Sequence, residues 1–166
     1  MNEDSIESRV RAVVDFLGVP YEIMPCDPDF ADTAQFCERY GIPLDHSANT
    51  IVVASKKEPK QYAACLVLAD SRLDVNHAVS EAMGIRRLSF ASAEETTALT
   101  GMLVGGVTVF GLPPQIPILI DSRVMDQDYV ILGGGNRSTK VKMPPQGLLD
   151  MAEARVIEGL AARRES

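Results

Sequence analysis

Hydrophobic residues near the start of the chain recur at spacings of three and four, the period of an amphipathic helix. They are Ile6, Val10, Val13, Val14 and Leu17. We therefore expect a first helix that ends at Gly18. A similar spacing near the end of the chain, after Pro144-Pro145, predicts a last helix. Its hydrophobic face would hold Leu148, Leu149, Ala152, Val156 and Leu160.

Three internal segments begin with the polar caps that are typical of helices, and the first two also end at a glycine. Residues 33–40 form the first, with Thr33 as the expected N-cap. Asp74 and Gly84 bound the second. Residues 92–100 form the third, which begins with the spacing of a capping box.

Other segments have the continuous or alternating hydrophobic pattern of strands. Residues 50–54 and 62–68 are separated by a lysine-rich turn and predict a hairpin that is nearly buried on both faces. Further strands are expected at 21–24, 88–90, 116–120, 129–132 and 140–143. Helices interspersed with hairpins predict an α+β (mixed α/β) fold, a mixed and largely antiparallel curved sheet covered by helices. We expect residues 1–166 to form a single domain.

Composition limits the classes of function. The chain has 166 residues, and its longest hydrophobic runs are far shorter than the roughly 20 residues of a membrane helix. The acidic beginning lacks the features of a secretory signal, so we expect a cytoplasmic protein without a membrane partner. A net charge of −7 disfavours a protein that coats DNA or other nucleic acid, but it leaves room for a contact with an RNA end.

The cysteines and histidines do not form a recognisable metal-binding or disulfide pattern. The three cysteines Cys26, Cys37 and Cys65 lack C-x-x-C spacing, and the two histidines are far apart in the sequence. We therefore expect reduced, mostly buried cysteines, no metal and no cofactor. The familiar hydrolase and nucleotide-binding motifs are absent from the sequence.

The segment from Gly105 to Gly111, followed by a hydrophobic run, is the strongest candidate for chemistry. Glycines allow positive φ angles and let main-chain N–H groups approach a bound polar atom. The segment can therefore serve as an oxyanion hole or a phosphate nest, or simply as a turn. If it holds a ligand, we expect Gly106→Val to abolish activity with little loss of fold.

The order of several motifs resembles the YbaK/prolyl-tRNA-synthetase-associated domain family. They are Asn49-Thr50-Ile51-Val52-Val53, Leu66-Val67-Leu68-Ala69-Asp70-Ser71-Arg72-Leu73-Asp74, Met83 to Ser92, Val104 to Gly111, Ile118-Leu119-Ile120-Asp121 and Val130 to Asn136. The resemblance covers nearly the whole chain. It implies an aminoacyl-tRNA deacylase, which hydrolyses the ester between a wrong amino acid and the terminal adenosine of a tRNA.

The resemblance also implies roles for particular residues. Water would attack the ester carbonyl, while backbone amides hold the substrate oxygens and no metal takes part. The residues in the glycine segment are Gly105, Gly106, Thr108 and Gly111. The family lines its pocket at positions that match Tyr21, Thr50 and Ile51. The tRNA acceptor end would be the partner.

Two departures from the family pattern affect the site. Asn49 stands where the family usually has a lysine, so a mobile cation is replaced by a neutral amide. Thr108-Val109 stands where the family has serine and proline. Lys56, Lys57 or Lys140 can supply the missing charge if one of them reaches the cavity, and Asn49 can equally be a surface residue without a role.

Three hypotheses follow from the sequence. The chain is a trans-acting deacylase whose Asn49 and a displaced lysine orient the substrate. Alternatively, it is a weakened or inactive module that binds an aminoacyl-adenosine-like ligand or a tRNA acceptor end. The third is an interaction protein whose acidic surface docks a basic partner.

Overall fold

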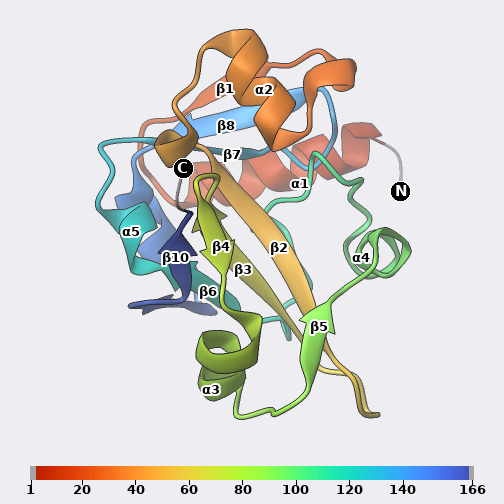
Figure 1. Ribbon diagram of the computed structural model, residues 1–166. Helices are drawn as coiled ribbons and strands as arrows, with labels where there is room; N and C mark the ends of the chain where they lie inside the picture. The colour runs from red at the N-terminus through yellow and green to blue at the C-terminus, as the bar shows by residue number, and fades with distance from the viewer. Residues whose placement is uncertain (1–2, 165–166) are drawn as a thin grey trace.

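The computed structural model of the protein describes residues 3–164, in which a central five-stranded sheet is flanked by two smaller sheets and five α-helices (Figure 1). The central sheet has the strand order β5-β2-β3-β6-β9. Its strands are β2 (Ala48–Ser55), β3 (Tyr62–Leu68), β5 (Leu88–Phe90), β6 (Ile118–Asp121) and β9 (Ala154–Ile157). β2 pairs antiparallel with β3 and β5, whereas β6 pairs parallel with β3 and β9.

A second sheet lies beside the N-terminal end of β2. It has the antiparallel order β1-β8-β7, formed by β1 (Glu22–Pro25), β7 (Val130–Gly133) and β8 (Thr139–Met143). A single bridge between Ser47 and Ile131 joins this sheet to the beginning of β2. The third sheet is a pair of short strands, β4 (Ser71–Leu73) and β10 (Ala161–Arg163).

The five α-helices of the described residues are short except for the first, and side-chain caps mark the start of two helical segments. The α-helices are α1 (Glu3–Phe16), α2 (Thr33–Tyr40), α3 (Ser80–Met83), α4 (Ala93–Thr100) and α5 (Ser122–Met125). A π-helical turn at Val75–Val79 leads into α3, and the Asp74 carboxylate accepts from the backbone N–H of His77 at its start. The Ser92 hydroxyl caps α4 by accepting from the N–H of Glu95. Within residues 3–164, none of the helices is both long and apolar enough to span a bilayer.

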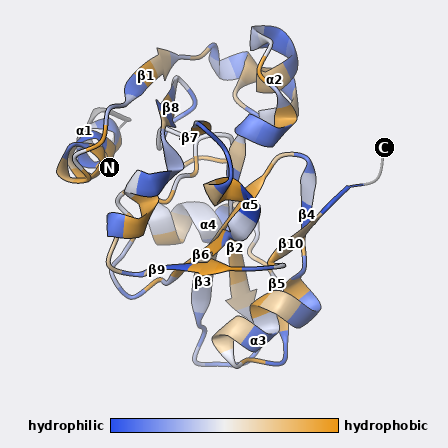
Figure 2. Cartoon of the chain, turned by 90° about the vertical axis from the view of Figure 1, so that its left-hand side faces the viewer, coloured by the Kyte–Doolittle hydropathy of each residue, from blue (hydrophilic) through white to orange (hydrophobic). Residues whose placement is uncertain are grey.

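Hydrophobic side chains cover both faces of the central sheet, and Figure 2 shows the hydrophobic colouring of β6 in the middle of the molecule. One face packs Leu66 and Ile120 against α1, where Val10 and Val14 are almost fully buried. The other face packs Val67 and Leu119 against the segment around α3, and this second cluster also includes Cys65, Val75 and Val79. Burial on both faces explains why these strands are continuously hydrophobic.

The predicted mixed α/β fold is confirmed, and so are the hairpin of β2 and β3 and the helices at 33–40, 74–84 and 92–100. The N-cap of α2 is Asp32 rather than Thr33, which is the first helical residue. The predicted link between the strands at 116–120 and 129–132 contains the short helix α5.

The predicted last helix is wrong. Its residues form a 3-10 segment at Pro145–Asp150, strand β9 and strand β10. Leu148 and Leu160 are buried as expected, but Val156 is 42% exposed. Because β6 has an edge that β9 completes, pairing in the sheet overrides the helical spacing, and the turn at Gly159 with φ of 78° would interrupt a helix in any case.

Candidate functional site

A cavity of about 420 Å³ lies against the N-terminal half of β2. It is lined by residues 47–52, by Asp32 and Thr33 at the start of α2, by Phe90, Ala91, Ala93 and Thr96, by Val104, Gly105 and Val107, and by Ile131, Leu132, Gly133 and Lys140. Figure 1 shows the elements that contribute these residues, α2 above β2 and α4 to its right. The walls are mostly small and hydrophobic, so the few polar groups in them define the chemistry.

Two neighbouring residues of β2 supply polar side chains. Asn49 accepts a hydrogen bond on Oδ1 from the Thr33 hydroxyl. This bond assigns the amide orientation and leaves the Asn49 NH₂ group, a double donor, without a protein acceptor among residues 3–164. Thr50 Oγ1 is buried and has no hydrogen-bond partner within the same described range. A buried polar atom without a partner costs about 1–3 kcal/mol, so the Thr50 hydroxyl is an unsatisfied polar group in a residue that lines the cavity.

Some residues of the glycine segment line the cavity, and others pack against the protein. Gly105, with φ of 94°, and Val107 line the cavity. Their backbone N–H groups donate to no acceptor in the part of the chain that the structure describes. Gly106 turns away: its N–H donates to the Leu103 carbonyl at 2.9 Å, and its carbonyl accepts from the Gly135 N–H at 2.7 Å. Two main-chain N–H groups of residues that line the cavity therefore have no protein acceptor within residues 3–164.

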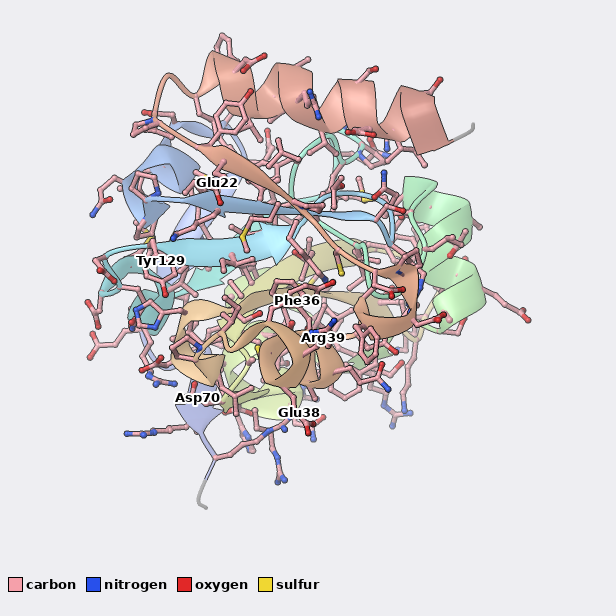
Figure 3. All side chains as sticks on the ribbon, turned by 90° about the horizontal axis from the view of Figure 1, so that it is seen from above. Glu22, Phe36, Glu38, Arg39, Asp70 and Tyr129 are labelled. Carbon is pink, nitrogen blue, oxygen red and sulfur yellow. The ribbon has the colours of Figure 1, made fainter. Side chains whose placement is uncertain are left out.

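Lys140 is a buried cation in the cavity wall, with 5% of its surface exposed. Its ammonium donates to the carbonyls of Ala31 at 2.7 Å and Gly105 at 2.8 Å, and it lies 5.1 Å from the centre of the Phe36 ring. Figure 3 looks down onto α2 and shows Phe36 on its inner side, with Glu38 and Arg39 on the outside. Burial lowers the pKa of Lys140.

Arg137 makes a second bridge between the same two loops. Its guanidinium donates to the Val104 carbonyl at 2.6 Å and to the Pro28 carbonyl at 2.7 Å, and it forms an ion pair with Asp32 at 3.1 Å. Arg137 and Lys140 thus fasten the loop before α2 to the glycine segment. Both side chains are cations, and both donate to main-chain carbonyls of the two loops.

The structure places five of the candidate residues around the cavity, namely Asn49, Thr50, Ile51, Gly105 and Lys140. It places the other candidates elsewhere. Tyr21 donates its hydroxyl to Asp15, Gly111 packs against Arg9, and Lys56 lies in the exposed hairpin turn.

Two members of the glycine segment are also removed from the cavity surface. Thr108 is completely buried, and its hydroxyl has no partner within residues 3–164. A Cβ on Gly106 would lie 2.2 Å from the Asn136 carbonyl oxygen, so this glycine is required for packing. Sequence reasoning missed the wall residues Asp32 and Val107, because nothing in their local pattern distinguishes them from a helix start and a turn.

The cysteines are unsuited to nucleophilic chemistry. All three are buried and free, and burial raises the pKa of Cys65 to about 12. Burial also raises the pKa values of Cys26 and Cys37. Because the thiolate is the reactive form, these residues belong to the core.

The family model described as the aminoacyl-tRNA editing domain matches residues 27–151. The Enterococcus faecalis protein EbsC, named as a candidate Cys-tRNA(Pro)/Cys-tRNA(Cys) deacylase, is 20% identical over 130 residues, which are 78% of this chain and 77% of EbsC.

Solved structures share the fold. The crystal structure of hypothetical protein APE2540 has a TM-score of 0.81 at 24% identity and covers 92% of this chain and 99% of its own. The crystal structure of a candidate trans-editing enzyme for prolyl-tRNA synthetase has a TM-score of 0.79 at 20% identity and covers 99% of each chain.

Proposed function

Because this chain belongs to the aminoacyl-tRNA editing domain family, as its resemblance to the YbaK proteins predicted, we propose that it is a trans-acting aminoacyl-tRNA deacylase. It hydrolyses the ester of a mischarged tRNA by attack of water. The observation that carries the proposal is one cavity in which two main-chain N–H groups, the Asn49 amide and the Thr50 hydroxyl are all left without protein acceptors within residues 3–164. The name of EbsC, a Cys-tRNA deacylase candidate, supports the same class of substrate.

The N–H groups of Gly105 and Val107 are the proposed oxyanion donors. When water adds to the ester carbonyl carbon, negative charge develops on the carbonyl oxygen, and preorganised donors stabilise it. The loss of one such donor typically raises the barrier by about 2.7–4 kcal/mol. The ester C–O bond then breaks, and the proton from water passes to the departing ribose oxygen.

Arg137 strengthens the Gly105 donor. It donates to the Val104 carbonyl, which belongs to the same peptide group as the Gly105 N–H. A charged hydrogen bond on the carbonyl polarises that peptide and makes its N–H a better donor. Lys140 adds positive charge beside the same loop, although two of its three N–H bonds are already donated to carbonyls.

Asn49 and Thr50 complete the proposed site. The Asn49 NH₂ group donates to the substrate in place of the family lysine, because its oxygen is held by Thr33. Thr50 Oγ1 can both donate and accept, so it is suited to orient the attacking water.

A second candidate function is a module that binds an aminoacyl-adenosine-like ligand or a tRNA acceptor end without hydrolysis. The engagement of Asn49 by Thr33 and the carbonyl-bound state of Lys140 favour it, since neither group is a mobile cation. The two functions differ in turnover and share the cavity.

Deacylation of a panel of aminoacyl-tRNAs by the purified protein tests the proposal. At least one should be hydrolysed faster than in buffer, and Asn49→Ala should reduce that rate about tenfold or more, because it removes a hydrogen-bond donor to the substrate. Asn76→Ala, an exposed asparagine outside the cavity, is the matched control. A panel as stable as in buffer, together with binding of acceptor-stem RNA, would select the binding module.

Asn49→Lys sharpens the same test. Restoring the cation of the family should raise kcat/KM or change the amino acid that is preferred, because an ammonium attracts the developing charge more strongly than an amide. The measurement is kcat/KM across the same panel. An unchanged profile would show that position 49 does not face the reaction.

A further inference from the structure

Four exposed cations from two separate loops gather at the far end of β2. Lys56 and Lys57 follow β2 in the hairpin turn, and Arg86 and Arg87 precede β5. The loops are joined directly, since the Lys56 N–H donates to the Arg87 carbonyl at 3.0 Å and Ser55 pairs with Leu88. Figure 1 shows the hairpin tip beside β5 at the bottom of the molecule. We call Lys56, Lys57, Arg86 and Arg87 the basic cluster.

The basic cluster is not neutralised by the protein. In the described part of the chain, none of its four members forms an ion pair, whereas the neighbouring Lys60 lies 3.7 Å from Glu95. Glu58 is the single acidic residue in the two loops that carry the cluster, residues 55–61 and 85–89. In a chain with a net charge of −7, such a local excess of positive charge marks a surface for an anionic partner.

The turn that carries the lysines is held in a defined shape. Ser55 is buried, and its hydroxyl donates to the Lys57 carbonyl at 3.1 Å and accepts from the Gln61 N–H at 2.8 Å. The Ser55 N–H also donates to the Gln61 carbonyl at 2.8 Å. The two lysines are therefore presented from an ordered turn.

The basic cluster and the cavity lie at different positions along the same two neighbouring strands, β2 and β5. Phe90 lines the cavity and is 60% exposed, and Arg87 lies three residues before it. At about 3.3 Å per residue, Arg87 is about 10 Å from Phe90 along β5, and Lys56 is about 20 Å from Thr50 along β2. These spans correspond to about three to six nucleotides at roughly 3.4 Å each.

We propose that the basic cluster docks the acceptor stem of the tRNA by contacting phosphates about three to six nucleotides from the acylated 3′ end. This inference rests on the proposed function for the identity of the RNA. Phosphate contacts of this kind position a nucleic acid without reading its sequence. The cluster would thus hold the stem while the terminal adenosine enters the cavity beside Phe90.

The test compares two substrates that differ in phosphates. One is an aminoacylated acceptor-stem RNA and the other is the corresponding aminoacyl-adenosine, which reaches the cavity but not the cluster. The double variant Lys57→Gln/Arg86→Gln should raise KM for the stem about tenfold with kcat unchanged, and leave aminoacyl-adenosine hydrolysis unchanged. Its KM should also depend less on salt, since each lost phosphate contact removes about a three- to fourfold change between 50 and 200 mM salt.

The double variant Arg72→Gln/Arg164→Gln is the matched control, because it removes the same charge from exposed positions in β4 and after β10. It should leave both substrates unaffected. Equal effects of the two double variants, or an unchanged KM and salt dependence for Lys57→Gln/Arg86→Gln, would overturn the docking proposal.

Binding of uncharged acceptor-stem RNA, measured by fluorescence anisotropy, separates this inference from the proposed function. If the wild-type protein binds the RNA in a cluster-dependent way but hydrolyses no ester, the deacylase proposal fails and the docking surface stands. If the protein hydrolyses both substrates and neither rate depends on the basic cluster, the docking proposal fails and the deacylase proposal stands.

Discussion

The two glycine-rich segments of this chain, residues 105–106 and 133–135, lie against each other but have different surroundings. Gly105 faces the cavity with its N–H available, whereas Gly135 donates its N–H to the Gly106 carbonyl. A Cβ on Gly133 would lie 2.4 Å from the Val107 carbonyl oxygen. One segment lines the cavity, and the other lets the backbone of the first come close enough to form a hydrogen bond. Glycine composition alone does not distinguish these two uses.

The strongest test of this comparison is Gly106→Val. A Cβ at this position would lie 2.2 Å from the Asn136 carbonyl oxygen, which is backbone and cannot move aside cheaply. We expect the fold to lose at least about 3 kcal/mol, contrary to the sequence-based expectation of a local loss of activity. Thermal unfolding measures the effect. Gly159→Ala, where a Cβ meets nothing within 4 Å but φ is 78°, should cost only about 1 kcal/mol. A Gly106→Val protein with normal stability would show that the two segments do not hold each other.

The next largest effect on stability and activity is expected for Lys140→Met. The substitution leaves the buried carbonyl of Ala31 and the half-buried carbonyl of Gly105 without their partner, at a cost of about 2 kcal/mol, and it releases one wall of the cavity. We therefore expect deacylation to fall tenfold or more. Lys142→Met, two residues along the same strand and half-buried, should preserve activity. Equal activity of the two variants would mean that the glycine segment keeps its position without Lys140.

Thr50→Val should affect activity with little effect on stability. The Thr50 hydroxyl has no protein partner among residues 3–164, so its removal should leave the free energy of unfolding unchanged or slightly higher while lowering kcat/KM. Thr97→Val provides the opposite case, because that hydroxyl donates to the Met102 carbonyl at 2.9 Å. It should cost about 1 kcal/mol and preserve activity. If Thr50→Val is as active as the wild type, Thr50 does not orient the attacking water.

Local sequence signals were sufficient for most of the fold. The hydrophobic runs of β2 and β3, the Ser92 cap and the glycine stops at 41 and 84 all act within a few residues, so the pattern predicts them. The prediction of a last helix after Pro145 was wrong because Val156 fits a helical spacing as well as a position in a strand. Only the pairing of β9 with β6, far away in the sequence, decides between them.

The candidate site was predictable to the extent that its residues are neighbours in the chain. Asn49, Thr50 and Gly105 came from motifs, but the contact of Lys140 with Gly105 joins residues 35 positions apart. Gly106 and Gly111 were grouped with Gly105 because all three lie in one glycine-containing segment, although their surroundings differ: Gly106 packs against Asn136 and Gly111 against Arg9. Which face a loop residue presents depends on what packs behind it, and that is a property of the whole fold.

Strand β9 also covers an edge of β6 that could otherwise pair with a second copy of the protein. The segment that matches the family ends at residue 151, before β9 begins at Ala154. A chain cut at residue 151 would expose the outer hydrogen-bonding edge of β6, whose four residues are all buried in the intact protein. An open edge of such hydrophobic character is a template for intermolecular pairing. Shortened versions of this protein should therefore aggregate even where the cavity itself is intact.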